Sequence, residues 1–386
     1  MKFTTKLQID RTVGRLLCFA LIPFVYILGI IMRRDHTMTD DNVKCIVVAK
    51  YFGLGSITHA MPMLRALKER YPDAKVVFVS RKSNASFFAL ISDIDAAYYI
   101  DDSSIICLIR SSFQLLYDLI RLKVDLFFDL EVFSTYGTIV SLFSLARNRL
   151  GFFASHSTNF KVWIYTHLMY FNFHTPVRLC YMQLARLAGA GAESSIQLIP
   201  YAVPDAVRNS AEKRLKEMVP DRHSGLIAIN ANASELSFAR RWPLDRFTKV
   251  AEHFAGLGYH ILLLGSPEEH SYVERIKTDI HAPSNISIHP YIHNVAGRFP
   301  LLEVPALLQL CDAFVTTDSG LMNFAYAQGV KTISLHGPNI PHYTDIDNNM
   351  NVPIYKNTYC SHVCIYSTSL YVREAHTVCL TLKLVK

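Results

Sequence analysis

Two segments in opposite halves of the chain share one order: an apolar run, a turn containing glycine, and a helix-like stretch. In the first half, Val43–Ala49 leads into Leu54–His59, which reads LGSITH. In the second half, Ala313–Val315 leads into Thr317–Leu321, which reads TDSGL. Strand–glycine turn–helix units are typical of nucleotide-binding α/β domains, where the turn lies at the carboxyl end of a parallel strand. We therefore expect an α/β chain with two Rossmann-like domains that face each other across a cleft.

The length and the pattern along the chain support two domains. At 386 residues the chain is too long for one ordinary core. From residue 44 onward, short apolar runs alternate with helical stretches, as in parallel sheets buried on both faces. This predicts an N-terminal membrane segment over 1–40, a first Rossmann-like domain over 41–195, an interdomain connection over 196–225, a second Rossmann-like domain over 226–350 and an unassigned tail over 351–386. The predicted strands are Cys45–Ala49, Lys75–Ser80, Ala96–Ile100, Leu126–Leu130, Leu226–Asn230, His260–Leu264, Ile286–His289, Ala313–Thr316 and Thr332–Leu335.

The composition limits the kinds of molecule that the chain is expected to bind. The chain is 51% hydrophobic and only 18% charged, a composition that hints at membrane contact. Its net charge of +7 has two open interpretations: drift without function in a cytosolic protein, or attraction to anionic lipid or a phosphorylated substrate. No block of like charge and no RNA-binding signature is present, so no nucleic-acid partner is predicted. The eight cysteines are scattered and form no convincing zinc pattern, so no metal site and no cofactor is predicted.

The first 40 residues contain an apolar run, Leu16–Met32, flanked by Arg11 and Arg15 before it and by Arg33 and Arg34 after it. Its length is at the lower limit for a membrane-spanning helix. The symmetric arginines give no orientation by the positive-inside rule. Three interpretations stay open: a spanning anchor, a re-entrant segment with both ends cytoplasmic, and an apolar helix packed on the protein's own surface.

The loop after the first strand is a candidate ligand-binding turn. Gly53 and Gly55 would let a ligand approach the N–H groups at a helix start, and Lys50 precedes them. We take Pro62 to lie in the first turn of the following helix, where proline is tolerated. His59 could donate a hydrogen bond to a substrate oxygen; alternatively, the glycines only form a turn.

Arginines follow the strand that ends at Asn230. The segment contains the small residue Ser234 and then Arg240 and Arg241 before a Trp-Pro helix start. Hydroxyl and guanidinium groups at a strand's carboxyl end suit a diphosphate. Alternatively, Trp242 starts a packed helix and the arginines are solvated.

Two further strand ends point to the same edge of the second sheet. Asp318, Ser319 and Gly320 open a helix whose N–H groups could hold a phosphate, or only cap the helix. Glu269, after another strand, is expected to bond ribose hydroxyls. In the first domain, Glu131 follows a strand and is either a general base or a helix-capping carboxylate.

These residues together resemble glycosyltransferase family 9, the ADP-heptose:lipopolysaccharide heptosyltransferase family, from about Val43 to about Asp345. The matching motifs, in order, are Lys50 with the loop Leu54–Pro62, Asp129–Val132, Arg240–Pro243, Asp318–Asn323 and Gly337–Pro338. The set in this order is specific, whereas each piece alone is not.

The resemblance implies a GT-B type fold and an inverting, metal-independent sugar transfer. It also implies that the first domain, 41–195, is the acceptor domain and that the second, 226–350, binds the nucleotide-sugar donor. Two residues depart from the family pattern. Its base aspartate is Ser56 here, and its helix histidine is Asn323. Serine cannot act as a general base near neutral pH without help, so either Glu131 has taken the role or the chain is inactive.

The sequence therefore predicts a membrane-associated glycosyltransferase on the cytoplasmic face of the inner membrane. Its partners would be a nucleotide diphosphate sugar and a glycan or glycolipid acceptor, such as lipopolysaccharide. Ser234 and Arg240 would hold the diphosphate, and His59 would orient the acceptor or leaving group. The alternative is a degenerate, non-catalytic member that binds a sugar nucleotide or a glycolipid.

Overall fold

The computed structural model describes residues 9–38, 42–154, 156–191, 193–220, 225–233, 238–279, 289–344 and 350–356. The chain divides into two compact units, Met1–Gln197 and Leu198–Lys386. Each unit is described by itself.

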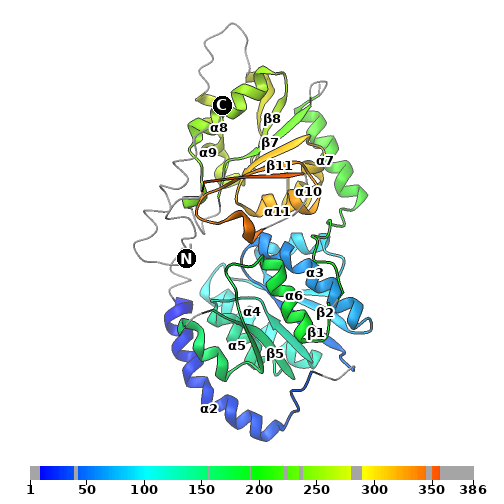
Figure 1. Ribbon diagram of the computed structural model, residues 1–386, viewed down its shortest axis with the longest axis vertical. Helices are drawn as coiled ribbons and strands as arrows, with labels where there is room; N and C mark the ends of the chain where they lie inside the picture. Colours follow the sequence, from blue (N-terminus) through cyan, green and yellow to red (C-terminus); the bar gives the residue numbers. More distant parts are fainter. Residues whose placement is uncertain are drawn as a thin grey trace. The chain divides into compact units, whose positions relative to one another are not determined.

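The first unit has one sheet of six strands, all parallel, in the order β3-β2-β1-β4-β5-β6 (Figure 1). From β1 the chain adds strands toward one edge of the sheet, and from β4 it adds them toward the other. The strand order therefore reverses between β1 and β4, and the switch point lies at the carboxyl ends of these two strands. The strands are β1 Cys45–Ala49, β2 Lys75–Arg81, β3 Ala96–Ile100, β4 Leu126–Asp129, β5 Asn148–Phe153 and β6 His167–Tyr170. The helices are η1 Asp10–Gly14, α2 Arg15–Met32, α3 Leu54–Arg70, η2 Lys82–Leu90, α4 Ile105–Leu122, α5 Thr135–Phe143, η3 His156–Trp163 and α6 Val177–Leu187.

The second unit repeats this plan with the strand order β12-β11-β10-β7-β8-β9, again all parallel. Here the order reverses between β7 and β10. The strands are β7 Leu226–Asn230, β8 His260–Leu263, β9 Ile292–Asn294, β10 Ala313–Thr317, β11 Thr332–His336 and β12 Asn351–Tyr355. The helices are α7 Asp205–Met218, η4 Phe238–Arg240, α8 Leu244–Gly256, η5 Pro267–Glu269, α9 His270–Thr278, η6 His289–Tyr291, η7 Leu301–Glu303, α10 Val304–Gln309, α11 Gly320–Ala327 and η8 Pro341–Tyr343.

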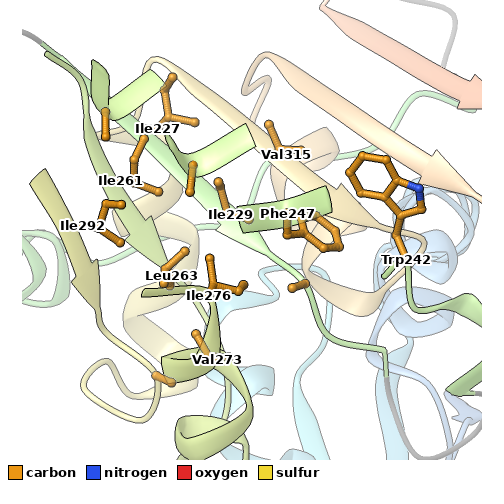
Figure 2. Close-up of a cluster of buried hydrophobic side chains, with 14 of the residues drawn as sticks. Ile227, Ile229, Trp242, Phe247, Ile261, Leu263, Val273, Ile276, Ile292 and Val315 are labelled. Atoms are coloured by element: carbon orange, nitrogen blue, oxygen red, sulfur yellow. The ribbon is translucent and has the colours of Figure 1, made fainter. Parts of the chain in front are cut away.

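Apolar strand runs explain both cores. In the second unit, Ile227 and Ile229 of β7 pack with Ile261 and other side chains of the neighbouring strands and of α8 and α9 (Figure 2). Trp242, just before α8, meets the Phe247 ring edge-on at 5.2 Å. The predicted α/β class with two Rossmann-like domains is confirmed.

Several predicted boundaries differ from the structure. Helix α3 begins at Leu54, so Pro62 lies in its interior and the prediction of a first-turn proline is wrong. The 196–225 segment contains α7, which packs against α10. The second sheet extends to β12, beyond residue 350. The strand predicted at 286–289 falls largely outside the described residues, and its end, 289, opens η6.

The N-terminal helix is fastened to the first unit at its beginning. The Asp10 carboxylate accepts hydrogen bonds from the backbone N–H of Thr135 at 3.1 Å and of Tyr136 at 2.8 Å. Those N–H groups belong to the first turn of α5, where no intrahelical partner exists. Gly14 allows this approach, because a Cβ at that position would overlap the Thr135 hydroxyl. Asp10 therefore caps a helix that lies 125 residues away.

We predict that Asp10→Ala lowers the free energy of unfolding by about 1–2 kcal/mol, because two N–H groups at the start of α5 lose a charged acceptor. Denaturant unfolding followed by circular dichroism measures the change. Asp73→Ala, in an exposed turn of the same unit, is the matched control and should stay within about 0.5 kcal/mol of the parent. Equal stabilities for the two variants would contradict the capping role.

Candidate functional site

The loop between β1 and α3 is shaped by a glycine and by a carboxylate. Gly53 has φ +81°, a left-handed conformation that glycine adopts at little cost, and it directly precedes α3. Ser56 lies in the first turn of α3, and His59, one turn later, is buried. Gly55 is also buried within that first turn. The N-terminal turn of α3 thus stands at the carboxyl end of β1.

Glu131 holds this loop in place. Its Oε1 accepts hydrogen bonds from the backbone N–H of Tyr51 at 2.8 Å and of Phe52 at 3.0 Å. Its Oε2 forms an ion pair with Lys50 Nζ at 2.9 Å. The Glu131 side chain is 9% exposed. Both carboxylate oxygens therefore have partners inside the first unit, and this geometry favours a role in positioning the loop over the predicted role as general base.

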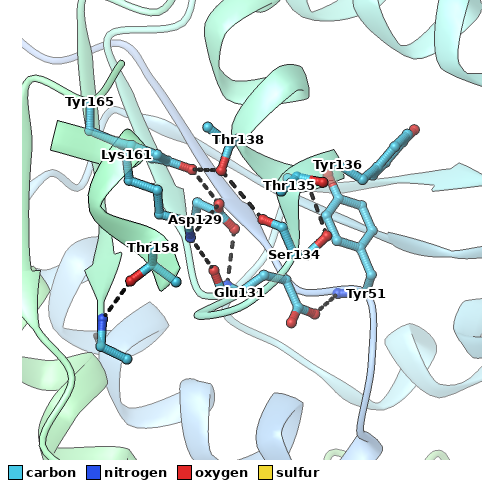
Figure 3. Close-up of polar contacts among 12 residues, drawn as sticks. Tyr51, Asp129, Glu131, Ser134, Thr135, Tyr136, Thr138, Thr158, Lys161 and Tyr165 are labelled. Carbon is cyan, nitrogen blue, oxygen red and sulfur yellow. Dashed lines mark hydrogen bonds and ion pairs between the residues drawn. The ribbon is translucent and has the colours of Figure 1, made fainter. Parts of the chain in front are cut away.

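A second buried carboxylate, Asp129, lies behind Glu131 (Figure 3). Asp129 accepts hydrogen bonds from the Tyr165 hydroxyl and from the Glu131 backbone N–H. Lys161, from η3, is fully buried, with Nζ 3.9 Å from Asp129 Oδ2 and 2.7 Å from the Glu131 carbonyl oxygen to which it donates. Burial raises the pKa of Asp129 and lowers the pKa of Lys161. This buried polar cluster joins the end of β4 to η3.

In the second unit, Arg240 and Asp318 come together beside the switch point between β7 and β10. Arg240 Nη1 is 3.7 Å from Asp318 Oδ2, and both side chains are nearly buried. Asn339 Nδ2 donates to the same Asp318 oxygen at 2.6 Å. Burial raises the pKa of Asp318, but Arg240, His336 and the Asn339 hydrogen bond outweigh it and hold the pKa below its ordinary value. An ionised Asp318 therefore orients Arg240.

The turn after β10 is held by side chains of the switch-point strands. Ser319 caps α11 by accepting from the Met322 N–H, and its hydroxyl also accepts from Asn230 Nδ2 at 3.0 Å. Asn230 contacts Thr316 as well, at 3.1 Å. Gly320 is the first residue of α11, so its N–H belongs to those a helix leaves unpaired at its start. This turn is a candidate anion site of the kind found at such strand ends.

Arg241 and Glu269 form a separate pair at the end of β8. Arg241 Nη2 lies 3.8 Å from Glu269 Oε1, and the guanidinium stacks over the rings of Phe238 at 4.5 Å and Tyr272 at 4.2 Å. Glu269 Oε2 accepts the Ser266 backbone N–H at 2.9 Å as part of a capping box. Glu269 therefore already has two partners, and its predicted ribose contact stays a prediction.

Sequence reasoning found the loops but missed several of the side chains. Arg240, Asp318, Ser319 and Gly320 lie at one switch point as expected, whereas Ser234 falls outside the described residues. Lys161 was missed because nothing in the sequence marks a lysine for burial. The other side chains that the sequence did not single out are Asn230, Asn339, Tyr165 and Thr316.

Two Rossmann-like units, each with polar groups at its switch point, define an α/β protein with the architecture that many nucleotide-binding proteins share. Residues 134–371 match the family model of glycosyltransferase family 9 (heptosyltransferase), more than half of the 386 residues. The chain belongs to this family, and the resemblance seen in the sequence is confirmed.

Curated relatives match over shorter stretches. The chain is 35% identical to lipooligosaccharide heptosyltransferase 2 of Haemophilus influenzae over 111 residues, 29% of this chain and 31% of that protein. It is 32% identical to lipopolysaccharide heptosyltransferase 2 of Escherichia coli over 111 residues, with the same coverage of 29% and 31%. The matched stretch thus spans about a third of the length of these relatives.

Solved structures match over most of the chain. A glycosyl transferase family 9 protein from Veillonella parvula superposes with a TM-score of 0.70 at 20% identity, covering 82% of this chain and 88% of that one. The E. coli ADP-heptose lps heptosyltransferase II gives a TM-score of 0.67 at 19% identity, covering 87% and 98%. These likenesses confirm the GT-B type fold.

We predict that Lys161→Met lowers the free energy of unfolding by about 3–5 kcal/mol, because it leaves Asp129 buried without its cation. Denaturant unfolding measures the loss. The double variant Asp129→Asn/Lys161→Met removes both charges and should recover part of that stability. A single variant as stable as the parent would show that the pair is not a buried ionic contact.

Proposed function

We propose that this chain is a glycosyltransferase that moves a sugar from a nucleotide diphosphate sugar to a lipopolysaccharide or other lipid-linked acceptor. Family membership supports the reaction class. The observation that carries the proposal is the oriented Arg240 beside the capped start of α11, at the switch point of the second sheet. A guanidinium and helix N–H groups at one strand edge are suited to a diphosphate.

We propose ADP-heptose as the donor, because one structurally similar protein is named an ADP-heptose lps heptosyltransferase. In this proposal Arg240 neutralises the diphosphate, helped by Ser234 and the backbone of Ser319 and Gly320. Asp318 keeps Arg240 in place and takes no proton. The transfer would invert the sugar and need no metal, since the guanidinium stabilises the leaving diphosphate electrostatically. We further propose that the chain works on the cytoplasmic face of the inner membrane, where it would meet a lipid-linked acceptor.

Arg240→Ala should weaken binding of ADP-heptose or ADP tenfold or more, because one charge-assisted contact contributes about 1.5–3 kcal/mol. Isothermal titration of the full chain measures the affinity. Lys249→Ala, which removes an exposed cation of α8 in the same unit, should leave the affinity unchanged. If Arg240→Ala binds as tightly as Lys249→Ala in a folded protein, Arg240 does not contact the donor.

Glu131 has two possible roles in the first unit: general base, or a carboxylate that positions the neighbouring loop. The family's base position is Ser56, and Glu131 was the predicted substitute. Its pairing with Lys50 and with two backbone N–H groups instead supports a positioning role, in which Glu131 fixes the loop that leads to Ser56 and His59. The two roles make different kinetic predictions.

Glu131→Gln separates them. Gln keeps one acceptor for the Tyr51 and Phe52 N–H groups but cannot take a proton. A base role requires kcat to fall by about 10²–10⁴-fold with loss of the acidic limb of the pH–rate profile. A positioning role predicts a smaller loss, an unchanged pH profile and a similar loss in Lys50→Met. We expect the second pattern, and a pH profile that loses its acidic limb would restore the base assignment.

A second candidate function is a non-catalytic member that binds a sugar nucleotide or glycolipid. The specific observation in its favour is Ser56 at the family's base position, together with the occupied carboxylate of Glu131. Turnover of ADP-heptose with crude membrane glycolipid distinguishes the two. Donor binding at the affinity of active relatives, with no sugar transferred to any acceptor, would favour the binding protein.

A further inference from the structure

Both ends of the apolar helix α2 are tied to the same unit. At its beginning, Asp10 caps α5. At its end, Arg34 donates to the carbonyl of Leu145, and His36 Nδ1 lies 2.7 Å from the carbonyl of Arg147. These contacts flank α5 on both sides, so the polypeptide before α2 and the polypeptide after it meet one folded body. A helix that crosses a bilayer would place these two ends on opposite sides of it.

The side of α2 that faces the unit is packed. Cys18 is fully buried against Leu142 and Phe160, and Phe24 lies 5.9 Å from the Phe143 ring, centroid to centroid. Figure 1 shows α2 running beside α5. Docking therefore fixes α2 along the surface of the first unit.

The other side of α2 is apolar and exposed. The most apolar 18-residue window of Thr12–Met32 has a mean hydropathy of 2.3, and only 6% of that window is buried. Leu16, Tyr26 and Ile31 are 71%, 73% and 72% exposed. An apolar stretch of this length is suited to lipid rather than to water.

Helix α4 carries a second exposed apolar stripe. Ile106 and Phe113 are 79% and 71% exposed, and they share one side of the helix with further apolar residues, namely Ile105, Ile109, Tyr117 and Ile120. These positions recur every three to four residues, so they form one strip. The opposite side of α4 packs on the sheet through Leu115 and Leu119. Helix α5 contacts both α4 and α2, so the two helices with exposed apolar sides adjoin one short helix.

Basic side chains accompany both apolar sides. Arg33 follows α2, Arg110 and Arg121 lie on α4, and Lys123 follows it; all four are exposed. Apolar side chains edged by arginine and lysine match the chemistry of an anionic membrane surface, where acyl chains adjoin negative headgroups.

We propose that the exposed sides of α2 and α4 form a lipid-docking face, and that α2 lies in the plane of the membrane instead of spanning it. The occupant is the surface of a bilayer that contains anionic lipid. Arg15, Phe19, Phe160 and Trp163 line a hollow between α2 and η3. This inference deepens the proposal of a lipid-linked acceptor, but its test measures lipid binding and not sugar transfer, so the two proposals fail separately.

The first experiment is sedimentation of the full chain with vesicles of phosphatidylethanolamine and phosphatidylglycerol. The double variant Ile106→Ser/Phe113→Ser should weaken binding at least tenfold. Leu257→Ser, a 60% exposed apolar residue of the second unit, is the matched control and should bind as the parent does. Thermal unfolding confirms that each variant is folded. Binding unaffected by the double variant would remove α4 from the face.

The second experiment reads the depth of α2 by quenching with phospholipids brominated at shallow or deep acyl positions. The chain has two tryptophans: Trp163, which is 65% exposed, and Trp242, which is buried. The variant Trp163→Phe therefore keeps only a buried tryptophan, which the lipid quenchers cannot reach. In that variant, single tryptophans replace Leu16, Tyr26 or Ile31. An in-plane helix predicts shallow quenching at all three positions.

Two outcomes would overturn the proposal. Deep quenching at position 26 with shallow quenching at positions 16 and 31 would show a spanning helix. Failure of the parent chain to bind the vesicles, together with self-association in sedimentation equilibrium without lipid, would assign the face to a second copy of the chain. Quenching of native Trp163 in the unmodified chain gives a check that needs no substitution on α2.

Discussion

The turn at residues 129–131 is the point on which the first unit depends. Lys161 is buried beneath it, donates to the Glu131 carbonyl and faces the Asp129 carboxylate. A buried cation and anion contribute little net stability, because desolvation offsets their attraction, but removing either one is costly. The pair therefore fixes the geometry of the turn more than it stabilises the fold. The Glu131 side chain in turn positions the loop, because its carboxylate accepts hydrogen bonds from the N–H groups of Tyr51 and Phe52.

The same turn leads to the elements that we propose face the membrane. Helix α5 begins at Thr135, a few residues after Glu131, and its first N–H groups are bonded to Asp10. The Tyr51 ring meets the Tyr136 ring edge-on, 5.3 Å between centroids, so the loop at Tyr51 adjoins the start of α5 (Figure 3). If α2 rests on lipid as we propose, the loop between β1 and α3 is held at a set height above that surface. A flexible tether would not give that constraint.

The sequence predicted what depends on pattern and missed what depends on distant partners. Apolar runs marked most strands, and parallel sheets bring strand ends to one edge, so Arg240 and Asp318 could be placed together. Strand β5 was missed because it opens with Asn148 and Arg149, which break the apolar run. The docking of α2 was left open because its composition fits a spanning helix equally well. The contacts that distinguish a docked helix from a spanning one, such as Asp10 with Thr135, join residues 125 positions apart in the sequence.

Recognition and chemistry are assigned to different units in this chain. The groups proposed for the donor, Arg240, Asp318 and the start of α11, have their partners within the second unit. The departure from the family pattern, Ser56, and the carboxylate nearest to its loop, Glu131, belong to the first. Ser56 is therefore not among the groups proposed for the donor, and an intact arginine is equally compatible with an enzyme and with a binding protein. An enzyme differs from a binding protein here in needing proton transfer, which we assign to the first unit. There, Lys50 neutralises the carboxylate nearest the loop, so any base chemistry must either break that ion pair or proceed without Glu131.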